Sequence, residues 1–549
     1  MKKLPPWAIS FDSTLYNKTG SWRNFRPVYE NKLPPCNDAC PAGEQIQGYI
    51  DLLNNNQYRQ AWELLTKNNP LPATCGRVCF HPCETACNRA TYDEAIAVHN
   101  IERFIGDYGL SHKLSFKRPA KRKSKKVAIV GGGPAGLSCA YQLALMGYRP
   151  TILEASSRLG GLLTNAIPSY RLPKRVAQAE IDRIVRLGVN VKTNFRLGRN
   201  ESFAGLTCEY DAIFIATGAY IERKLGIAGE DNHNVIPALE FLDMLARGRK
   251  PKLGREIAVI GGGNAAMDAA RSLLRMGKDP LIIYRRTKGE MPAIPDEIHE
   301  AEEEKIPFLF LTAPVKILTK GSKITGLECI RMKLGPVDKS GRRSPVPIKG
   351  SNFKVKLDGI ITAIGEMAET SFLPPGVLND GWIRADGNGM TVVNGVFVGG
   401  DALTGPRTVV EAIGAGKRAA FAINEYLVKG KLNQPQPKTT KPVAFEELNT
   451  AYFEVAPRMD MQKLPVNKRT SSFDEVLQGY KDETLHKEST RCFSCGVCNK
   501  CDNCFIFCPD MAVLKKKSGY EFNYDYCKGC GVCVTECPRR AISLVEEKR

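Results

Sequence analysis

The sequence lacks any hydrophobic run long enough to cross a bilayer, and it lacks a recognisable export signal. No segment of its 549 residues approaches the ~20 consecutive apolar residues of a membrane-spanning helix. The first residues, MKKLPPWAISFDSTLY, contain no apolar stretch of signal-peptide length. We therefore expect a cytoplasmic protein without a membrane span.

Cysteine is scarce over most of the chain and concentrated near its two ends. None occurs before residue 36, and sixteen of the nineteen lie within 36–87 and 492–537. A long chain without an export signal does not fit a secreted disulfide scaffold, so metal-ligand spacings point to iron–sulfur clusters or zinc. The other three, Cys139, Cys208 and Cys329, are scattered, and we interpret them as structural.

Acidic residues are outnumbered, and the formal net charge is +20. Part of this charge lies in KRPAKRKSKK, residues 117–126. This segment is either a solvated basic linker or a surface that steers acidic protein partners. No recognition motif accompanies the charge, so we expect no nucleic-acid partner.

A first glycine fingerprint follows a short apolar strand in KVAIVGGGPAGLSCAYQLALMG. Its diagnostic positions are Gly131, Gly133 and Gly136. Strand, glycine loop and helix in this order bring a pyrophosphate to the helix N-terminus. Glu154 ends the next strand about twenty residues on, where an acid can hydrogen-bond a ribose hydroxyl.

A second fingerprint occurs in EIAVIGGGNAAMDAARSLLRMG. Its diagnostic positions are Gly261, Gly263 and Ala266, and alanine is tolerated in the third place. The following strand, PLIIYRRT, carries Tyr284 in the acidic slot and then Arg285 and Arg286. Guanidinium groups there would bind a 2′-phosphate, so NADP(H) is favoured, with NAD(H) as the alternative.

Two dinucleotide sites in one α/β unit predict a flavin and a nicotinamide placed to exchange hydride. The segment VNGVFVGGDALTGPRTVVEAIGAGKRAA supports this prediction, because its strand ends at Gly400 and Asp401 and a helix begins near Thr408. In two-dinucleotide flavoproteins such an Asp and such a helix start face the flavin. The segment returns the chain to the first domain, so we expect the nicotinamide domain to be inserted in the flavin domain.

The C-terminal tail holds two ferredoxin-type quartets of the form C-x2-C-x2-C-x3-C-P. In two-cluster ferredoxins the fourth cysteine of each motif ligates the other cluster. The first cluster would therefore use Cys498, Cys501, Cys504 and Cys537. The second would use Cys527, Cys530, Cys533 and Cys508. Cys492 and Cys495, just upstream, are left over.

Residues 30–430 strongly resemble the glutamate synthase small-subunit family of NAD(P)H oxidoreductases and the N-terminal module of dihydropyrimidine dehydrogenase. The resemblance rests on CGRVCFHPCETAC, VAIVGGGPAGL, IPSYRLPK, VIGGGNAAMDAAR, YRRTKGEMPA and the Asp401 segment. It implies FAD, a nicotinamide cofactor and two [4Fe–4S] clusters in a helical N-terminal domain. It also implies Gly161, Gly218 and Asn264 as cofactor-binding positions.

The same resemblance implies the N-terminal cluster ligands. The cluster nearer the flavin would take Cys40, Cys79, Cys83 and Glu102, in a place where the family has Glu or Gln. For the other cluster, family members carry an early E-x-x-R-C-x-x-C segment, which is missing here, so Cys36 and Cys87 form half a site. ESTRCFSC, residues 488–495, has that form at the other end of the chain. We expect Cys492 and Cys495 to complete the cluster; the alternatives are a lost site or a pair that serves another subunit.

The expected fold is α/β, with a helical N-terminal Fe–S domain, two nested Rossmann-like domains and a C-terminal α+β ferredoxin domain. The expected boundaries are 1–122 for the helical iron–sulfur domain, 123–255 and 381–428 for the FAD domain, 256–380 for the NAD(P)H domain, 429–487 for a linker and 488–549 for the ferredoxin domain. We expect an electron-transfer subunit that moves electrons between NAD(P)H and a partner oxidoreductase subunit or ferredoxin, through FAD and four [4Fe–4S] clusters, in a hetero-oligomer. The alternatives are a stand-alone reductase of a quinone or ferric chelate and, more remotely, a non-catalytic redox sensor.

Overall fold

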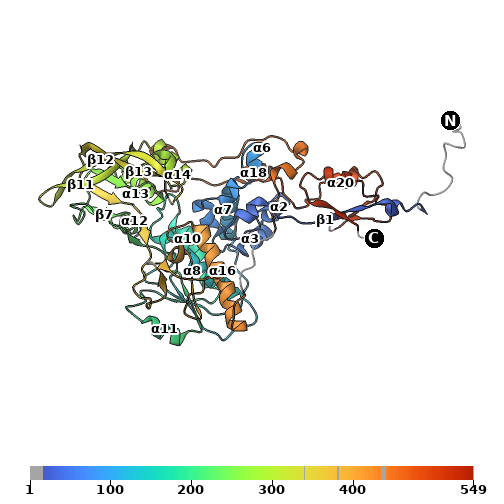
Figure 1. Ribbon diagram of the computed structural model, residues 1–549, viewed down its shortest axis with the longest axis horizontal. Helices are drawn as coiled ribbons and strands as arrows, with labels where there is room; N and C mark the ends of the chain where they lie inside the picture. Colours follow the sequence, from blue (N-terminus) through green and yellow to red (C-terminus); the bar gives the residue numbers. More distant parts are fainter. Residues whose placement is uncertain (1–15, 339, 380–381, 434–439, 518, 548–549) are drawn as a thin grey trace.

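The computed structural model describes residues 16–338, 340–379, 382–433, 440–517 and 519–547. In Figure 1 a small lobe carrying α20 (Val532–Thr535) lies at one end and the N-terminal helices lie in the middle. One α/β lobe lies at the opposite end, and the other lies below the helices in this view. Within the described ranges, no helix is both long enough and apolar enough to cross a membrane.

The first α/β lobe is built on a parallel five-stranded sheet in the order β18-β5-β2-β3-β4. Its strands are β2 (Val127–Val130), β3 (Thr151–Leu153), β4 (Asn190–Lys192), β5 (Ala212–Ile215) and β18 (Val396–Val398). The flanking helices are α8 (Pro134–Leu145), α10 (Lys174–Val185), α11 (Phe203–Glu209) and α16 (Val409–Lys429). Helices α8 and α16 cross at Gly416, where a Cβ would lie 2.0 Å from the Ala135 carbonyl oxygen. The chain leaves this sheet after β5 and returns with β18, so the nested arrangement is confirmed.

The second lobe has a parallel sheet in the order β10-β9-β8-β14-β7. Its elements are β7 (Val235–Pro237), α12 (Ala238–Ala246), β8 (Glu256–Ile260), α13 (Asn264–Arg275), β9 (Asp279–Ile283), α14 (Pro295–Glu303), β10 (Phe308–Leu309) and β14 (Gly359–Thr362). An antiparallel sheet of β11 (Thr312–Lys320), β12 (Lys323–Val337) and β13 (Arg343–Val355) is attached to it.

The expected limits of the nicotinamide domain, 256–380, need correction at both ends. Strand β7 pairs with β14, so the second sheet begins before residue 256. The two crossings between the lobes pair with each other as β6 (Ile221–Glu222) and β15 (Glu366–Met367). The inserted unit therefore lies between residues 223 and 365. The chain then forms β16 (Leu378–Asn379) and β17 (Trp382–Ile383) before it rejoins the first sheet.

The N-terminal domain is helical, as expected. It contains α1 (Pro35–Ala39), α2 (Ile46–Asn54), α3 (Tyr58–Thr66), α4 (Pro72–Val78), α5 (Pro82–Thr85), α6 (Arg89–Tyr92) and α7 (Val98–Ser111). Helices α4 and α7 pack backbone to backbone, because a Cβ at Gly76 would lie 2.3 Å from the Arg103 nitrogen and one at Gly106 2.2 Å from the Ala73 nitrogen. This close crossing holds Cys79, at the end of α4, against α7.

The ferredoxin lobe is assembled from both ends of the chain. It contains α19 (Asn503–Ile506), β19 (Val513–Lys516), β20 (Gly519–Phe522), α20 (Val532–Thr535) and β21 (Ile542–Glu546). Strand β1 (Phe25–Tyr29) pairs antiparallel with β21, Phe25 opposite Glu546 and Tyr29 opposite Ile542. The expected boundaries of 1–122 and 488–549 therefore miss a strand that belongs to the C-terminal lobe.

Residues 440–481, here named the strap, were expected to form part of a linker but pack along the other domains. The strap contains two short 3-10 helices, Phe445–Glu447 and Thr450–Tyr452, and α17 (Val466–Arg469). Arg469 forms an ion pair with Glu303 at 2.5 Å, and Glu475 forms one with Arg77 at 2.6 Å. The strap thus connects the nicotinamide lobe to the N-terminal helices before α18 (Asp482–Thr490) begins.

Candidate functional site

A cavity of 780 Å³ lies between the two α/β lobes and is lined by the first glycine fingerprint and, from the second, by Asn264 and Ala265 but not by its glycines. Of the expected cofactor residues, eight line it: Gly131, Gly133, Glu154, Gly161, Gly218, Asn264, Asp401 and Thr408. The cavity is large enough for a dinucleotide, since ligand pockets of drug-sized molecules measure about 300–1,000 Å³.

The first fingerprint has the geometry that a bound pyrophosphate requires. Gly131 adopts φ +107°, and a Cβ there would lie 2.3 Å from the Ala216 carbonyl oxygen. A Cβ at Gly136 would lie 2.0 Å from the Gly131 carbonyl oxygen, so this glycine lets α8 pack on the loop rather than line the cavity. Gly161 and Gly133 face each other, with 3.0 Å between a Cβ built on Gly161 and the Gly133 Cα. The cavity wall here is bare backbone.

Polar groups of the first lobe stand at the carboxyl ends of its strands. Glu154 follows β3 and accepts a hydrogen bond from the Gly132 N–H at 2.7 Å. Burial raises the pKa of Asp401 to about 6. Thr408 caps α16 by accepting a hydrogen bond from the Glu411 N–H at 3.3 Å. Gly400, just before Asp401, has φ +65° and its Cβ would lie 3.0 Å from Ala135.

In the second fingerprint, a tyrosine ring covers the glycine loop at the position where an acidic residue was expected. Gly261 has φ +150°, and a Cβ built on it would lie 2.2 Å from the Ala363 carbonyl oxygen. Ala266 is fully buried. The Tyr284 ring lies 2.6 Å from a Cβ built on Gly262, and its hydroxyl donates to the Glu290 carbonyl oxygen at 2.8 Å. Gly263 begins the turn into α13.

The two predicted arginines have different surroundings. Arg286 is buried, forms an ion pair with Asp338 at 2.5 Å and donates to the Arg343 carbonyl oxygen at 2.7 Å. Arg285 is exposed. Partial burial, Arg286 and Arg342 lower the pKa of the Arg285 guanidinium. Arg342, on the hairpin between β12 and β13, was not predicted because it lies more than fifty residues from the fingerprint.

The IPSYRLPK segment joins the two lobes beside this cavity. Arg171 lines the cavity and forms ion pairs with Asp268 of α13 at 2.8 Å and with Glu297 of α14 at 2.6 Å. The Tyr170 ring lies under the Arg275 guanidinium, with 3.9 Å from its centroid to the Arg275 Cζ. This segment of the first lobe therefore fixes the orientation of α13 in the second.

The expected ligands of the cluster nearer the flavin lie next to the cavity. Val78 and Phe80 line the cavity, and Cys79 is the residue between them. Cys40, Cys79 and Cys83 are all buried. Helix α16 touches the Cys40 loop at Gly414, where a Cβ would lie 2.1 Å from the Pro41 carbonyl oxygen.

Glu102 is buried at this place together with a second carboxylate that sequence reasoning missed. The Asn69 amide donates to Glu102 Oε1 at 2.8 Å and to Glu44 Oε1 at 2.9 Å. Burial and Glu44 raise the pKa of Glu102 well above its usual range, and burial raises the pKa of Glu44 to about 7. Cys75, which was not expected as a ligand, is also buried here. Glu44 lies four residues after Cys40, a spacing that carries no motif.

A second unpredicted cluster lies between α5 and α7. His81, Glu84 and His99 place one ligand atom each within 4.8 Å of one another. Glu84 is already held by His99 Nδ1 at 2.8 Å and by the strap residue Arg458 at 2.7 Å. The imidazole rings of His81 and His99 stack with 3.9 Å between centroids. Because the carboxylate has its partners and the two rings stack at an interplanar angle of 24°, this cluster serves to connect α5, α7 and the strap.

Cys36, Cys87, Cys492 and Cys495 surround one enclosed space. Its other walls are mainly apolar and include Ile46, Ile50, Ile96, Val98 and Phe493. Burial and then the neighbouring Cys492, Cys87 and Cys495 raise the pKa of Cys36 well above its usual range. Burial likewise raises the pKa of Cys492 to about 11 and that of Cys495 to about 12. The two pairs of thiols, from opposite ends of the chain, thus lie within electrostatic range of one another.

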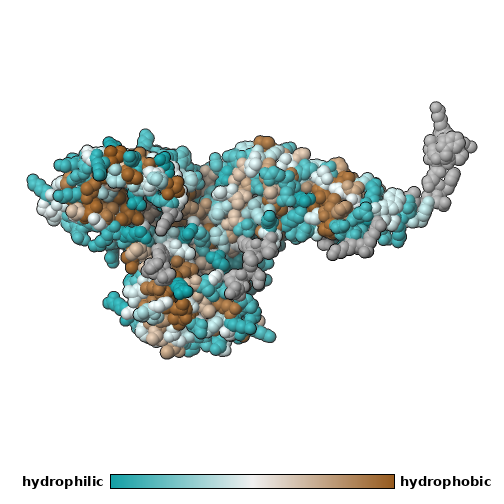
Figure 2. Space-filling view, viewed as in Figure 1, coloured by the Kyte–Doolittle hydropathy of each residue, from teal (hydrophilic) through white to brown (hydrophobic). Residues whose placement is uncertain are grey.

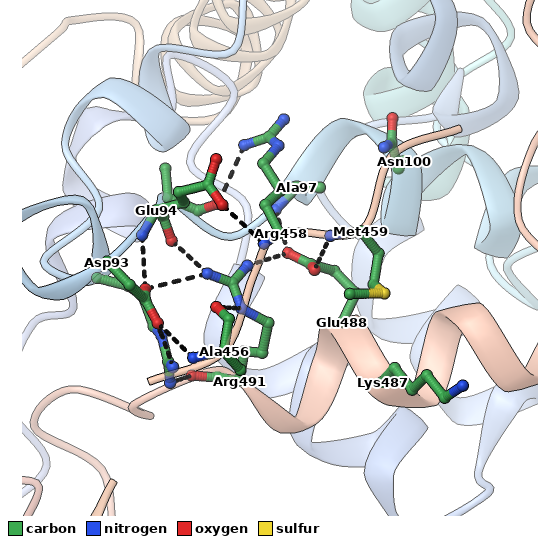
Figure 3. Close-up of polar contacts among 12 residues, drawn as sticks. Asp93, Glu94, Ala97, Asn100, Ala456, Arg458, Met459, Lys487, Glu488 and Arg491 are labelled. Carbon is green, nitrogen blue, oxygen red and sulfur yellow. Dashed lines mark hydrogen bonds and ion pairs between the residues drawn. The ribbon is translucent and has the colours of Figure 1, made fainter. Parts of the chain in front are cut away.

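Glu488 anchors the helix that carries the C-terminal pair (Figure 3). It is fully buried on α18. Its Oε1 accepts from the Ala97 N–H, just before α7, at 2.8 Å, and its Oε2 accepts from the Met459 N–H of the strap, also at 2.8 Å. One carboxylate therefore joins α18, the strap and the N-terminal domain.

Arg491 completes this anchor directly before Cys492 (Figure 3). Its guanidinium bonds to Glu488 Oε1 at 2.8 Å, to Asp93 Oδ1 at 3.0 Å, to the Glu94 carbonyl oxygen at 2.7 Å and to the Ala456 carbonyl oxygen at 3.1 Å. The E-x-x-R portion of ESTRCFSC is thus a clamp on the N-terminal domain. We name Glu488, Arg491 and Asp93 the clamp.

The ferredoxin quartets are arranged crosswise. The cysteines that raise the pKa of Cys504, after burial, are Cys498, Cys501 and Cys537. Those that raise the pKa of Cys533, after burial, are Cys527, Cys508 and Cys530 first. The Tyr29 hydroxyl, from β1, lies 3.1 Å from the Cys504 Sγ. Each expected set of four thiols is therefore brought together, and the N-terminal strand contacts one of them.

Fold and site together define an NAD(P)H-dependent flavin oxidoreductase with iron–sulfur domains. Three families match the chain: pyridine nucleotide-disulphide oxidoreductase at residues 120–416, dihydropyrimidine dehydrogenase domain II, 4Fe-4S cluster, at 26–114, and a 4Fe-4S binding domain at 520–543. The chain belongs to the pyridine nucleotide-disulphide oxidoreductase family.

Several characterised proteins are similar over most of the chain. The NADP(+)-dependent formate dehydrogenase subunit beta of Moorella thermoacetica is 39% identical, over 84% of this chain and 70% of that protein. The NADPH-Fe(3+) oxidoreductase subunit beta of Geobacter sulfurreducens is 36% identical, over 86% and 76%. The glutamate synthase [NADPH] small chain of Azospirillum brasilense is 31% identical, over 73% and 88%. A variant of FprA from Mycobacterium tuberculosis has the same fold over 56% of this chain and 86% of its own, with a TM-score of 0.50 and 20% identity.

Proposed function

We propose that this chain is the electron-transfer subunit of a larger oxidoreductase, acting between NADP(H) and a partner protein through one FAD and four [4Fe–4S] clusters. The observation that carries the proposal is the position of Cys79. Its two chain neighbours, Val78 and Phe80, line the cavity that is also lined by the first dinucleotide fingerprint and by Asn264, which follows the glycines of the second. A cofactor in that cavity would therefore lie beside the first set of metal-ligating thiols.

In this proposal the first lobe holds FAD. The glycine backbone of residues 131–133 and the start of α8 would bind the pyrophosphate, and Glu154 a ribose hydroxyl. Asp401 and the α16 N-terminus would face the rest of the flavin nucleotide. When bound, FAD exchanges a hydride with the nicotinamide and single electrons with iron–sulfur clusters.

The second lobe would hold NADP(H). Tyr284 occupies the position where an acidic side chain would repel a 2′-phosphate. Arg285 is exposed near Arg286 and Arg342, and it has no carboxylate partner in the described part of the chain. A dianionic phosphate would relieve the repulsion among these guanidinium groups. Arg286, whose charge is balanced by Asp338, would position the hairpin rather than bind the phosphate itself.

The iron–sulfur sites would have the expected ligand sets. Three buried thiols and Glu102 would hold the cluster nearest the flavin. Cys36, Cys87, Cys492 and Cys495 would hold the second, because four cysteine sulfurs in an enclosed space are the donor set of a [4Fe–4S] cluster. The two crosswise quartets would hold the last two, in the lobe farthest from the cavity.

Two relatives are named as beta subunits and one as a small chain, which supports a role as one subunit of a complex. A second candidate is reduction of a ferric chelate by this chain alone. The name of the Geobacter relative and the exposure of Cys501 and Cys530 favour it. High turnover of the isolated chain with ferric citrate, equal to that of the complex, would establish the second candidate instead.

The test of the proposal is anaerobic analysis of the purified chain. We expect one FAD and about sixteen irons, together with bleaching of the flavin absorbance by NADPH. About eight irons would show that the two N-terminal sites are empty. A flavin that NADPH does not bleach would contradict the proposed reaction.

A further inference from the structure

The ferredoxin lobe carries an apolar surface that the fold does not use. Hydrophobic residues reach the surface of the lobe that carries α20 (Figures 1 and 2). On α19 and the chain that follows it, five large apolar side chains are exposed, here named the tail patch: Phe505, Ile506, Phe507, Met511 and Leu514. Ile506 is 67% exposed and Met511 82%. Contiguous exposed apolar residues of this kind mark interaction sites in soluble proteins.

The tail patch lies between ligands of both ferredoxin clusters. Residues 505–507 are the three residues between Cys504, which belongs to one crosswise set, and Cys508, which belongs to the other. Cys501, two residues before α19, is itself exposed. A protein that covered the tail patch would therefore approach both proposed clusters at once.

Basic side chains lie along one side of the tail patch. Strand β19 packs against α19 and runs from Leu514, a member of the patch, into the lysines 515–517. Lys515 contacts Asp502 at 2.8 Å and Lys516 contacts Glu521 at 3.7 Å, but both lysine side chains remain more than half exposed. Exposed pairs of this kind are weak and can be exchanged for intermolecular ones. The lysines thus suit a partner with carboxylates at the matching edge.

We propose that the tail patch, with lysines 515–517 at its edge, is the docking surface for the redox partner protein. The partner's contact face would be apolar at its centre and acidic at its rim. This inference rests on the proposed electron-transfer function and specifies where the partner binds. Apolar contact supplies the affinity, and charge complementarity orients the partner so that its redox centre faces the tail.

The test compares two double variants in the native host. F505S/I506S changes the patch, and F421S/V428S changes two residues of similar exposure on α16, 52% and 65%, far along the chain. The full-length chain is purified with its stoichiometric partner and treated with a carbodiimide, which joins lysines to carboxylates. We expect cross-links from lysines 515–517 to the partner's Asp or Glu, and at least about tenfold weaker partner binding by F505S/I506S only.

The outcomes separate docking from the reaction itself. Flavin bleaching by NADPH and iron content should match the wild type in both double variants, and the single variant I506S provides the same comparison if the double variant loses iron. If NADPH does not bleach the wild-type flavin, the proposed function fails, whatever binds the patch. Docking is overturned if the partner stays bound to F505S/I506S, if cross-links map elsewhere, or if no stoichiometric partner is found. Docking is also overturned if the wild type but not F505S/I506S forms dimers, or floats with phosphatidylglycerol vesicles, because the tail patch would then bind a second copy or a membrane surface.

Discussion

The two iron–sulfur regions take their parts from the chain in opposite ways. In the ferredoxin lobe, all eight expected ligands lie within residues 498–537, and the other end of the chain adds no ligand but contributes the segment 18–29, which includes β1. In the N-terminal domain, one set of four thiols is divided between residues 36–87 and 492–495. The ferredoxin lobe takes a strand from the N-terminal end, and the N-terminal domain takes two cysteines from the C-terminal end. The N-terminal segment therefore pairs with the ferredoxin lobe through β1, and Cys492 and Cys495 lie beside Cys36 and Cys87.

This difference also explains the clamp. Ligands within one motif are held by their own loop, but ligands brought from 400 residues away need an anchor. Glu488 and Arg491 supply it with buried bonds to backbone groups of the N-terminal domain and the strap. Breaking a buried charge pair by removing one partner costs about 3–5 kcal/mol, so the anchor is strong enough to hold the pair in place.

The largest effect should follow from breaking the clamp. In R491M, Glu488 loses its buried ion-pair partner while Asp93 keeps Arg89 at 2.6 Å, so we expect a destabilisation of about 3–5 kcal/mol and loss of the divided cluster. The tail clusters should remain, because their ligands lie in a separate loop system. Anaerobic iron analysis with electron paramagnetic resonance of the reduced protein measures both.

Lys487 provides the matched control for the clamp. It lies on the same helix, but it is exposed, and among the described residues its ammonium group pairs with Glu483 alone. K487M should therefore leave the iron content unchanged, because exposed i,i+4 pairs contribute little. Equal iron in R491M and K487M would mean that the clamp does not position the cysteines.

A smaller effect is expected at the nicotinamide site, where the two arginines also differ. Arg286 is bound by Asp338 and the Arg343 carbonyl oxygen, whereas Arg285 is exposed and could bind a phosphate. R285A should raise the KM for NADPH by about tenfold to a hundredfold, the effect of losing one charge-assisted contact. The KM for NADH, which lacks the 2′-phosphate, is the internal control. A wild-type preference for NADH, or an equal change for both cofactors, would contradict this assignment.

The smallest effect is expected from a change in β1, the N-terminal strand of the ferredoxin lobe. Tyr29 of β1 places its hydroxyl 3.1 Å from Cys504, whose thiolate would accept the bond in a loaded cluster. Hydrogen bonds to cluster sulfurs favour the reduced state, so Y29F should lower one tail potential by an amount on the order of 30 mV. Y524F is the control, because the Tyr524 hydroxyl donates to the Pro27 carbonyl oxygen and not to a ligand. Redox titration followed by electron paramagnetic resonance should distinguish the two.

The features that could be predicted from sequence have local signals. Both fingerprints, the return of the chain at Asp401 and the cysteine spacings are patterns within about twenty-five residues, and the fold class follows from them. The pairing of Cys36 and Cys87 with Cys492 and Cys495 was expected because one end lacked two ligands and the other had two extra. The structure brings the four together, and their use as ligands stays a prediction.

The features that were missed depend on contacts between distant segments. The pairing of β1 with β21 joins residues more than 500 apart, and a five-residue strand carries no mark of its partner. The strap begins within a Pro- and Lys-rich run, residues 431–443, of which 434–439 lie outside the described residues, and it was expected to be part of the same linker. It packs instead through ion pairs such as Arg469–Glu303 and through backbone groups. Glu44 and the Arg286–Asp338 pair were missed for the same reason, since neither has a characteristic spacing.

We propose that the two ends of the chain hold one cluster jointly. The most direct test is iron and electron paramagnetic resonance analysis of C492S/C495S beside C36S/C87S, with C139S/C329S, which changes two buried cysteines outside every ligand set, as the control. We expect each of the first two variants to lose about four irons and the same resonance signal, while the control and both tail clusters are unaffected. If the first two variants lose different signals, or if C492S/C495S keeps all its iron, the two ends do not share a cluster.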